Sequence, residues 1–518
     1  MSIAQAFASY QQGKLADAEA VCTRILAAAP GDFDALHLLG LLRHQQMRDA
    51  EALELIGAVL KRAPRSPEVL NNYGLILAAL ARHEEALAHF DRALAISAGY
   101  LHALKNRARA LKALSRHEQA LAAHEAVLAA KPDELDALNE CGGLHLRLGR
   151  PAAAIACYDR ALAIAPRLVQ LHINRATALA AARRFDDALH GLASAIAIQP
   201  DCAEAHYRAS LIHLRRGDFK HGWRGFAWRL RTERAPKMRQ VAAPLWLGGQ
   251  PLDGKTILLL SEQGFGDTIQ FLRYAPLVAA LGAAVILDVP CELKALAAAV
   301  PGVAAVFDHD EPTPPVDFYS PLLSLPLSFQ TELATVPANV PYLRPSDDRL
   351  RRWRERMPQN GRRTVGICWA GSKAHLNDHN RSIGLDRFAR ILAVPNLNFV
   401  SVQKEISEAE AAILRDHHVA ALGRELRDFA DTAAVLAMLD LLVAVDTSVA
   451  HLAGALGKAV ALLLPFAPDW RWMDDRSESP WYPTMRLFRQ ATIGDWDGVL
   501  ERLCRELSAM AARPTRSG

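Results

Sequence analysis

Residues 443–457 read VAVDTSVAHLAGALG, and this stretch decides how the C-terminal part of the chain folds. It completes a short apolar run that begins at Leu441, breaks at a polar triplet (446–448), and resumes as a small-residue helical pattern that stops at Gly457. This order predicts a buried strand, a tight turn and a helix. The polar triplet then lies at the carboxyl end of the strand, the edge at which open α/β sheets bind ligands.

The residues of this turn suit an anionic ligand. A helix N-terminus offers unpaired N–H groups and the positive end of the helix dipole to a phosphate. Ser448 is predicted to be the N-cap, and His451 should lie in the first turn, facing the same crevice. Asp446, Thr447, Ser448 and His451 are therefore candidate ligand-binding residues. The alternative is that the triplet only caps a helix, since caps of this composition are common.

Length and composition set the outer limits. The chain has 518 residues, too many for one hydrophobic core, and should hold about three domains. Apolar residues make up 51% and charged residues 22%, so a large core is available and extended disorder is not expected. The net charge of +4 is small, and Lys and Arg are dispersed, so nothing indicates nucleic acid binding.

The cysteines and the N-terminus bear on the compartment. The seven cysteines form no C-x-x-C pair, which favours reduced thiols in a reducing environment. The N-terminal residues lack the basic and apolar regions of a signal peptide, and no apolar run reaches the length of a membrane span. We expect a cytoplasmic protein with no integral membrane segment.

The N-terminal part repeats with a period of 34 residues. Small residues and helix-ending prolines recur on this period, which lets paired helices approach closely and ends each pair. The pattern resembles the tetratricopeptide repeat and predicts an α-solenoid of about six repeats over residues 1–215. The prolines are Pro30, Pro64, Pro132, Pro166 and Pro200, and the small residues include Gly40, Gly74, Ala108, Gly142 and Ala176.

Three asparagines share one position of the repeat. Asn72, Asn106 and Asn174 fall on the first helix of their pairs, which lines the inner surface of such a superhelix, and Glu140 takes this place in the repeat between them. An amide can accept from and donate to an extended peptide without reading its sequence. The pattern resembles the asparagine ladder of the O-linked N-acetylglucosamine transferases and implies a protein or peptide acceptor in the repeat groove. The alternative is a set of solvated polar residues on a concave face.

A capping helix and a linker are expected over residues 216–254. Aromatic residues between 217 and 229 are predicted to close the solenoid and to dock it onto the next domain. Pro, Gly and Trp are then frequent from 235 to 254, which marks a domain junction.

An N-terminal Rossmann-like lobe is expected over residues 255–345. Alternating strands and helices imply a parallel sheet. Asp267 follows the first strand (256–261) and a glycine-rich turn, where a general base would be placed. It is also predicted to be an N-cap, with Gln270 as its capping-box partner. The strands predicted after the first are 285–289, 304–307 and one near 318–319.

A second Rossmann-like lobe is expected over residues 346–518, with a C-terminal helix. Two consecutive units of this kind predict two facing lobes with a cleft between them. Gly371, Ser372, Lys373 and Arg381 follow its first strand and supply N–H groups, a hydroxyl and cations that suit a diphosphate, although such loop residues are commonly only solvated. The predicted strands are 364–369, 398–402, 441–445, 459–464 and 485–488.

Several chemistries are disfavoured by absent motifs. There is no Gly-x-x-x-x-Gly-Lys-Ser/Thr loop and no Gly-x-Gly-x-x-Gly fingerprint, which argues against a nucleoside triphosphatase or a nicotinamide enzyme. No His/Cys/Asp group has metal-ligand spacing, and no Gly-x-Ser-x-Gly elbow occurs. We expect neither a metal nor a cofactor.

Two motifs resemble the lipopolysaccharide heptosyltransferases, an inverting glycosyltransferase class with the two-lobed GT-B fold. They are GFGDTIQ (264–270) and the DTS-x-x-HLA-x-ALG pattern (446–457), and the resemblance covers about residues 255–505. It implies that Asp267 is the catalytic base, that Lys373 and Arg381 neutralise the diphosphate of a nucleotide sugar, and that Asp446, Thr447, Ser448 and His451 hold this donor. Gln403 or Glu405 matches the position that contacts the ribose.

The chain departs from that family in two places. It carries the long repeat region, and an aromatic segment (469–483) replaces a shorter loop. These differences leave open whether the transferred sugar is a heptose and whether the acceptor is lipopolysaccharide. The aromatic residues either wall the sugar pocket or pack between the lobes and the repeats. Three functions are compatible with this pattern: a metal-independent glycosyltransferase with a protein acceptor, a glycosyltransferase with a saccharide acceptor, and a scaffold whose α/β part is a non-catalytic binding module.

Overall fold

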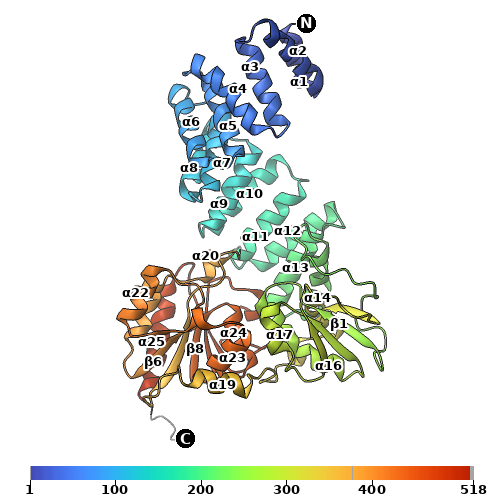
Figure 1. Cartoon of the computed structure of the whole chain (residues 1–518), viewed down its shortest axis with the longest axis vertical. Coiled ribbons are helices and arrows are strands. Elements are labelled where there is room, and N and C mark those ends of the chain that lie inside the picture. The colour runs from blue at the N-terminus through green and yellow to red at the C-terminus, as the bar shows by residue number, and fades with distance from the viewer. Residues whose placement is uncertain (1, 376, 514–518) are drawn as a thin grey trace. The chain divides into compact units, whose positions relative to one another are not determined.

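The computed structural model describes residues 2–375 and 377–513. By its internal contacts the chain divides into two compact units, Met1–Ile198 and Gln199–Gly518. The first contains stacked helices, and the second contains helices and two parallel β-sheets (Figure 1). The predicted order of an α-solenoid followed by two α/β lobes is confirmed.

The first unit consists of consecutive helix pairs. Within its described residues there are six such pairs, each formed by two helices that are neighbours in the chain (Figure 1). The helices are α1 (Ile3–Gln11), α2 (Leu15–Ala28), α3 (Phe33–Gln45), α4 (Asp49–Arg62), α5 (Pro67–Ala79), α6 (His83–Ile96), α7 (Leu101–Ala113), α8 (His117–Ala130), α9 (Leu135–Arg147), α10 (Pro151–Ile164), α11 (Val169–Ala181) and α12 (Phe185–Ile198).

Small residues set the distance between the helices of a pair. A Cβ added at Gly74 would lie 2.7 Å from the ring of Phe90, and one at Gly142 would lie 2.5 Å from the ring of Tyr158. Both separations are too short for carbon atoms, so each aromatic ring occupies the space that a side chain at the glycine would need. This explains why the first helix of the pair carries a small residue at this repeat position.

A further helix pair opens the second unit, formed by α13 (Ala203–Arg215) and α14 (Phe219–Phe226), with a short 3-10 turn η1 (Ala227–Arg231) after it. Trp223 of α14 lies edge-on to Trp470 and Trp481, with ring centroids 5.3 and 6.3 Å apart. Its indole Nε1 also donates to the carbonyl of Thr331 at 2.9 Å. The aromatic residues of the capping segment therefore dock onto the α/β region, as predicted. Trp470 and Trp481 are buried in this contact, which favours the packing role of the aromatic segment.

The first lobe contains a four-stranded parallel sheet in the order β3-β2-β1-β4. All four predicted strands are present, within one or two residues of the predicted ends. The elements are β1 (Thr256–Leu260), α15 (Phe265–Phe271), η2 (Leu272–Tyr274), α16 (Ala275–Ala279), β2 (Ala284–Asp288), α17 (Cys291–Ala297), β3 (Val303–Phe307), β4 (Phe318–Pro321), η3 (Leu322–Ser324), α18 (Leu325–Ser328) and η4 (Leu333–Thr335).

The second lobe contains a six-stranded parallel sheet in the order β10-β9-β8-β5-β6-β7. The five predicted strands are present, and the two-residue strand β7 was not predicted because it is too short to show a pattern. The elements are α19 (Asp347–Arg354), β5 (Arg363–Cys368), α20 (Asp378–Arg381), α21 (Leu385–Phe388), η5 (Ala389–Ala393), β6 (Leu397–Ser401), α22 (Glu408–Asp416), β7 (Ala420–Ala421), η6 (Gly423–Glu425), α23 (Phe429–Ala437), β8 (Leu441–Val445), α24 (Ser448–Ala455), β9 (Val460–Leu464), η7 (Trp470–Trp472), β10 (Met485–Arg489) and α25 (Trp496–Ala511).

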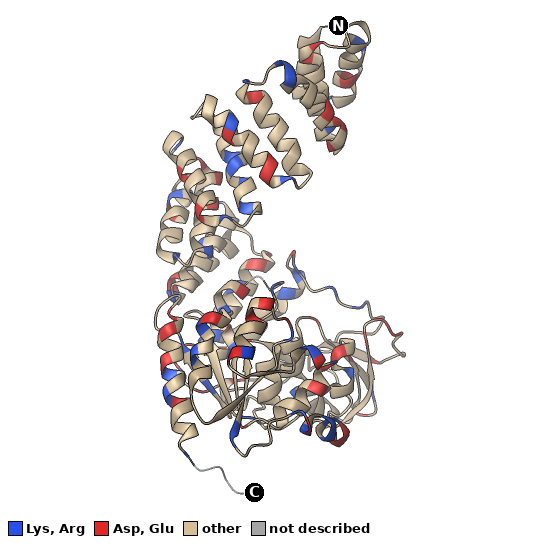
Figure 2. Cartoon of the chain, turned by 60° about the vertical axis from the view of Figure 1, so that its left-hand side comes forward, with Lys and Arg blue, Asp and Glu red and all other residues tan. Residues whose placement is uncertain are grey.

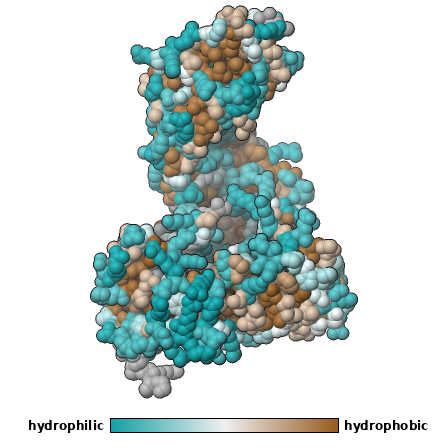
Figure 3. Space-filling model, viewed as in Figure 1, coloured by the Kyte–Doolittle hydropathy of each residue, from teal (hydrophilic) through white to brown (hydrophobic). Residues whose placement is uncertain are grey.

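The surface is mixed in character. Basic and acidic side chains are interspersed over both units (Figure 2), in agreement with the small net charge. Apolar side chains gather on the visible face of the first repeats (Figure 3). Phe7 of α1 and Met47, which follows α3, are exposed. None of the helices in the described part of the chain combines the length and the apolar character that crossing a bilayer requires.

Candidate functional site

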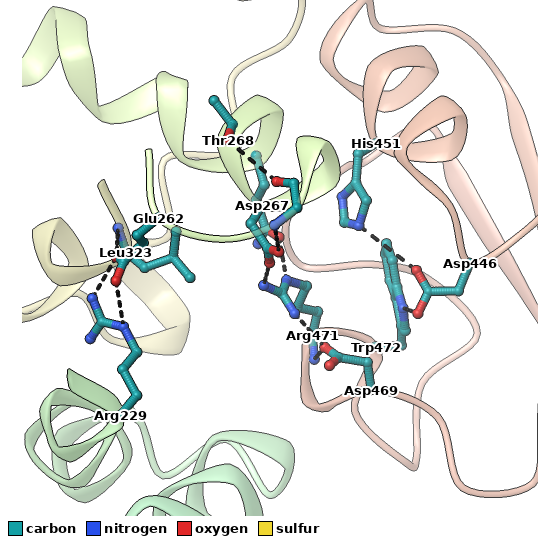
Figure 4. A network of polar contacts seen from close by, with 12 residues as sticks. Arg229, Glu262, Asp267, Thr268, Leu323, Asp446, His451, Asp469, Arg471 and Trp472 are labelled. Carbon is teal, nitrogen blue, oxygen red and sulfur yellow. Dashed lines mark hydrogen bonds and ion pairs between the residues drawn. The ribbon is translucent and has the colours of Figure 1, made fainter. Parts of the chain in front are cut away.

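The two strand–turn–helix loops singled out from the sequence lie against each other. A Cβ added at Gly266, in the first turn of α15, would lie 2.8 Å from Cδ2 of His451 and 3.5 Å from Cα of Ser448, which begins α24. Phe265 packs beside Phe429 of the second lobe, with ring centroids 5.0 Å apart. The carboxyl ends of β1 and β8 are thus brought together across the two lobes (Figure 4).

Asp267 lies in the first turn of α15. The N-cap is Gly264, and the carboxylate of Asp267, at the third helical position, accepts from the Gly264 N–H at 3.1 Å. The prediction that Asp267 is itself the N-cap is wrong, because the helix begins two residues before it. The reach of the carboxylate back to the cap still fixes its orientation, which is the property that the prediction required.

Arg471 is the main partner of Asp267 and was not predicted. It lies in η7, and its guanidinium donates to Asp267 Oδ1, to Gln270 Oε1 at 2.6 Å and to Asp469 Oδ1 at 2.8 Å (Figure 4). It also lies over the ring of Trp470, 4.5 Å from the centroid. The contact with Arg471 contradicts the prediction that Gln270 pairs with Asp267. A single arginine within an aromatic segment gives no sequence signal for such a role.

Two opposing effects act on the Asp267 carboxyl. Its side chain is 20% exposed, and that of Arg471 is 8% exposed. Burial raises the pKa of Asp267 above its ordinary value, and the neighbouring Arg471 guanidinium opposes this change. The Asp267 carboxyl is therefore both largely buried and paired with a cation.

Asp446 lies at the carboxyl end of β8, opposite Asp267. Its Oδ2 accepts from the indole Nε1 of Trp472 at 2.9 Å, and its Oδ1 lies 3.8 Å from Nε2 of His451 (Figure 4). Burial raises the pKa of Asp446 to about 6, and the nearby Asp469 adds to this increase. Nδ1 of His451 lies 3.0 Å from the hydroxyl of Tyr482, and burial lowers the pKa of His451 well below its ordinary value.

The start of α24 differs by one residue from the prediction. Thr447 is the N-cap and Ser448 is the first helical residue, so the assignment of Ser448 as the cap is wrong. Thr447 is buried, and its hydroxyl lies 3.9 Å from the thiol of Cys368. Thr447 has an extended backbone, and this contact links it to the end of β5.

The loop after β5 reaches the same place through Arg381. Its guanidinium donates to the backbone carbonyl of Asp446 at 2.9 Å, and a Cβ added at Gly371 would lie 2.4 Å from its Nη2. The N–H of Gly371 donates to Ser382 Oγ at 2.9 Å. Ser372 and Lys373 are exposed on the same loop. Gly371 and Arg381 therefore lie beside the turn at 446–448.

The two residues proposed for the ribose differ in burial. Gln403 is buried, and its Oε1 accepts from the N–H of Ala370 at 3.2 Å and lies 3.4 Å from Sγ of Cys368. It therefore links the carboxyl ends of β5 and β6. Glu405 is exposed two residues further along. Gln403 is thus positioned at the sheet edge, and Glu405 lies outside it.

The repeat asparagines form links between successive helices. Nδ2 of Asn106 donates to Oδ1 of Asn71 at 2.9 Å, and Nδ2 of Asn174 donates to Oδ1 of Asn139 at 2.8 Å. The amide of Asn72 lies 2.9 Å from Nε2 of His37. Each bond joins residues 35 positions apart, so a second polar position one residue earlier in the repeat was missed by the sequence analysis. Asn72, Asn106 and Asn174 are partly exposed, and their hydrogen-bond partners all belong to the first unit.

One group of potential metal ligands occurs among the described residues, although the sequence suggested none. Ligand atoms of His213, Asp218 and His221 lie within 4.8 Å of one another. The sequence analysis missed it because the three residues are adjacent only through the turn between α13 and α14. Asp218 also caps α14 by accepting from the N–H of His221, which accounts for its position without an ion.

The helix pairs have the architecture of tetratricopeptide repeats, and the chain continues into an α/β region of two parallel-sheet lobes, consistent with the Rossmann-like lobes of GT-B proteins. Residues 9–72 match one model of the tetratricopeptide repeat, and residues 50–100, 105–168 and 173–220 match another.

Protein FlbA of Caulobacter vibrioides is similar to this chain, with 24% identity over 389 residues. The match covers 67% of this chain and 63% of FlbA, so the chain spans about 63% of the length of that relative.

Solved structures of repeat proteins are similar to parts of the chain. The crystal structure of MamA protein has 17% identity and a TM-score of 0.31, covering 33% of this chain and 94% of that one. The C-terminal part of a TPR repeat-containing protein from Cytophaga hutchinsonii has 14% identity and a TM-score of 0.40, with coverage of 46% and 97%. PilW, titled a widely conserved type IV pilus biogenesis factor, has 22% identity and a TM-score of 0.37, with coverage of 39% and 94%.

Proposed function

We propose that the chain is a metal-independent, inverting glycosyltransferase that transfers a sugar from a nucleotide-diphosphate donor to an acceptor presented by the repeats. One observation carries the proposal: the oriented carboxylate of Asp267 and the N-terminus of α24 face each other, with Gly266 directly against His451. An acid on one sheet edge and an anion-binding helix start on the other are the two elements that sugar transfer from a diphosphate needs.

The donor would bind to the second lobe. Its diphosphate is proposed to lie at the start of α24, against Thr447, Ser448 and His451, with Arg381 beside it. Lys373 would add a second cation from the end of its long side chain, and the backbone at Gly371 and Ser372 would supply N–H donors. A leaving diphosphate is stabilised by cations and fixed dipoles, and removal of one such donor costs on the order of 100-fold in rate.

The other predicted donor contacts are assigned by burial. Asp446 would hold the indole of Trp472 and, when protonated, would not repel the diphosphate. Gln403 would fix the backbone at Ala370, and Glu405 would reach the ribose from the surface. In this proposal only Glu405 contacts the ribose, and Gln403 has a positioning role.

The chemical step would use Asp267 as the general base. The acceptor hydroxyl oxygen attacks the anomeric carbon, the bond from that carbon to the diphosphate oxygen breaks, and the hydroxyl proton passes to Asp267. Arg471 would release Asp267 Oδ1 as the acceptor enters, because it has Asp469 and Gln270 as further partners. Base catalysis of this kind contributes roughly 100- to 10,000-fold.

The acceptor is proposed to be a protein or peptide held in the repeat groove. Asn72, Asn106 and Asn174 would exchange their hydrogen bonds to His37, Asn71 and Asn139 for bonds to an extended backbone. Replacing all three with alanine should weaken transfer to protein and leave the slow hydrolysis of the donor unchanged. A loss of donor hydrolysis in this triple variant would count against a separate acceptor site.

The proposal is tested by titrating the full chain with uridine, guanosine, adenosine and cytidine diphosphate sugars in a calorimeter, followed by a radiolabelled transfer assay. Binding of one donor class and transfer of its sugar are expected. Absence of binding to every donor at millimolar concentration would overturn the proposal and leave a repeat scaffold. Donor binding with transfer only to saccharides would retain the enzyme and exclude the protein acceptor.

A further inference from the structure

A second group of reactive side chains lies at the carboxyl edge of the first sheet. Ser261 follows β1, Asp288 ends β2, and His309 is the second residue after β3. These three strands are neighbours in the order β3-β2-β1, and the N–H of Ser261 donates to the carbonyl of Asp288 at 2.9 Å. The topology therefore places a serine, an aspartate and a histidine side by side, although 48 residues separate the first from the last.

The three side chains form a hydrogen-bonded relay. Nδ1 of His309 lies 2.6 Å from Oδ1 of Asp288, and Nε2 of His309 lies 3.4 Å from Oγ of Ser261. When Nδ1 carries the proton and donates it to the carboxylate, Nε2 is left as an acceptor for the serine hydroxyl. This is the polarity of a Ser–His–Asp triad, in which the aspartate holds the imidazole and the imidazole accepts the serine proton.

Arg239, in the linker before β1, holds the relay through hydrogen bonds. Its Nε donates to Asp288 Oδ2 at 2.7 Å, which leaves Oδ1 to His309. Its two terminal nitrogens donate to the carbonyls of Asp308, His309 and Glu311, at 2.9, 2.7 and 2.6 Å. One guanidinium thus fixes both the carboxylate and the loop that carries the imidazole.

The three side chains of the group differ in burial. The Asp288 side chain is 1% exposed and that of His309 is 51% exposed, so the relay runs from the interior of the lobe to its surface. Ser261 is largely buried beside them. A substrate and then a water molecule would approach the serine hydroxyl from the side of the exposed His309 imidazole.

We propose that Ser261, His309 and Asp288 form a second catalytic site, which hydrolyses short-chain carboxylic esters. Ser261 Oγ attacks the ester carbonyl carbon and its proton passes to Nε2 of His309. The ester C–O bond then breaks, and the leaving alkoxide takes that proton from His309. Water, activated by His309, attacks the acyl-serine, releases the carboxylic acid and restores the Ser261 hydroxyl.

The substrate class follows from the surroundings of the serine. The apolar side chains next to the relay are few: Leu260 precedes Ser261, and Phe307 pairs in register with Asp288. Both belong to a small cluster with Ile286 and Val241. The proposal therefore takes an ester with a short acyl group, for which a small apolar cluster beside the serine is enough. The site is separate from the proposed glycosyl transfer, since none of its three side chains takes part there.

A fluorophosphonate probe tests the proposal on the full chain. The probe phosphonylates a serine only when a neighbouring base activates it, and the modified residue is located by mass spectrometry of the digested protein. We expect modification at Ser261, on the order of 100-fold slower labelling in His309→Gln, and a matching loss of p-nitrophenyl acetate hydrolysis. The exposed histidine variant His417→Gln and the exposed serine variant Ser346→Ala should both label at the wild-type rate.

Two variants distinguish the possible outcomes. Ser261→Ala should abolish labelling at this peptide, and His309→Gln carries the test on its own if that variant does not fold, because the His309 side chain is half exposed. Labelling of Ser261 that is no faster than that of Ser346, or that is equally fast in His309→Gln, would overturn the proposal.

Discussion

The loops β1–α15 and β8–α24 have the same plan and hold their carboxylates differently. Each follows a buried parallel strand and opens a helix. Asp267 lies inside its helix, reaches back to the cap and pairs with a guanidinium. Asp446 lies before its helix and receives an indole N–H instead. Burial raises the pKa of both carboxyls. At Asp267 the next largest effect is the opposing Arg471 guanidinium, and at Asp446 it is the Asp469 carboxylate, which adds to the increase. The difference shows that the charge of the nearest groups tunes a buried acid at a sheet edge.

Of the substitutions that distinguish the two loops, Asp267→Asn should have the largest effect. The amide keeps the shape of the side chain but cannot accept a proton, so sugar transfer should fall by roughly 100- to 10,000-fold. Binding of the donor to the second lobe should change little. Transfer rates and donor calorimetry on the same preparation measure the two effects, and near wild-type turnover would disprove the assignment of the base.

The positions of these two acids could be predicted from sequence, but their partners could not. Apolar runs followed by polar turns fixed the strands β1 and β8 and the sheet edge at which Asp267 and Asp446 lie. Arg471 is 204 residues from Asp267 along the chain. No periodicity relates residues so far apart, and only the packing of η7 between the lobes brings them together.

The repeats illustrate the other limit of sequence analysis. Their period fixed the helix pairs and the place of each small residue, since every pair makes the same contact. The cap positions in the lobes were each misplaced by one to three residues, at Asp267 and Ser448. Several polar residues in a row can all cap a helix, and a helix end commonly shifts by one or two residues among them.

Glu262→Gln tests whether the second acid of the first loop stabilises the fold, in contrast to the catalytic role proposed for Asp267. The Glu262 carboxylate is fully buried and accepts two hydrogen bonds from Arg229, at 2.6 and 3.1 Å (Figure 4). Neutralising it leaves the Arg229 charge buried without its counter-ion, which should cost about 3–5 kcal/mol of unfolding free energy. Urea denaturation measures this. The control is Glu506→Gln, which breaks an exposed pair with Arg486 and should cost under about 1 kcal/mol. Equal losses in the two variants would contradict the prediction.

Asp446→Asn tests the second loop through pH. The folded pKa of Asp446 is raised to about 6, whereas an unfolded aspartate titrates near pH 4. The folded chain therefore holds an extra proton between these values, and its stability falls by about 3 kcal/mol as the pH rises through this window. Asparagine does not titrate, and its amide oxygen can still accept from Trp472.

The measurement is the difference in unfolding free energy between wild type and Asp446→Asn at pH 4 and at pH 6.5. We expect the wild type to lose stability relative to the variant as the pH rises. Arg381, Arg471, Asp469 and His451 face the same carboxyl group and are common to both proteins, so the difference isolates Asp446. A difference that does not change with pH would show that the carboxyl is not protonated in the folded state.

Gly266→Ala tests the contact between the two loops and should have the smallest effect. The new Cβ would lie 2.8 Å from Cδ2 of His451, whose ring is buried and hydrogen-bonded to Tyr482, so the two loops must move apart. Such overpacking costs about 1–3 kcal/mol, partly offset by the higher helix propensity of alanine. Gly264→Ala is the control for the added volume, because its nearest neighbour would be Asp267 Oδ2 at 3.5 Å, an ordinary contact. Since Gly264 is the N-cap, alanine there should cost about 0.5–1 kcal/mol. Thermal unfolding should show a lower midpoint for Gly266→Ala than for Gly264→Ala. If the two midpoints coincide, the lobes are not in contact at this point in solution, and Asp267 and the α24 N-terminus would have to be brought together by closure around the substrate.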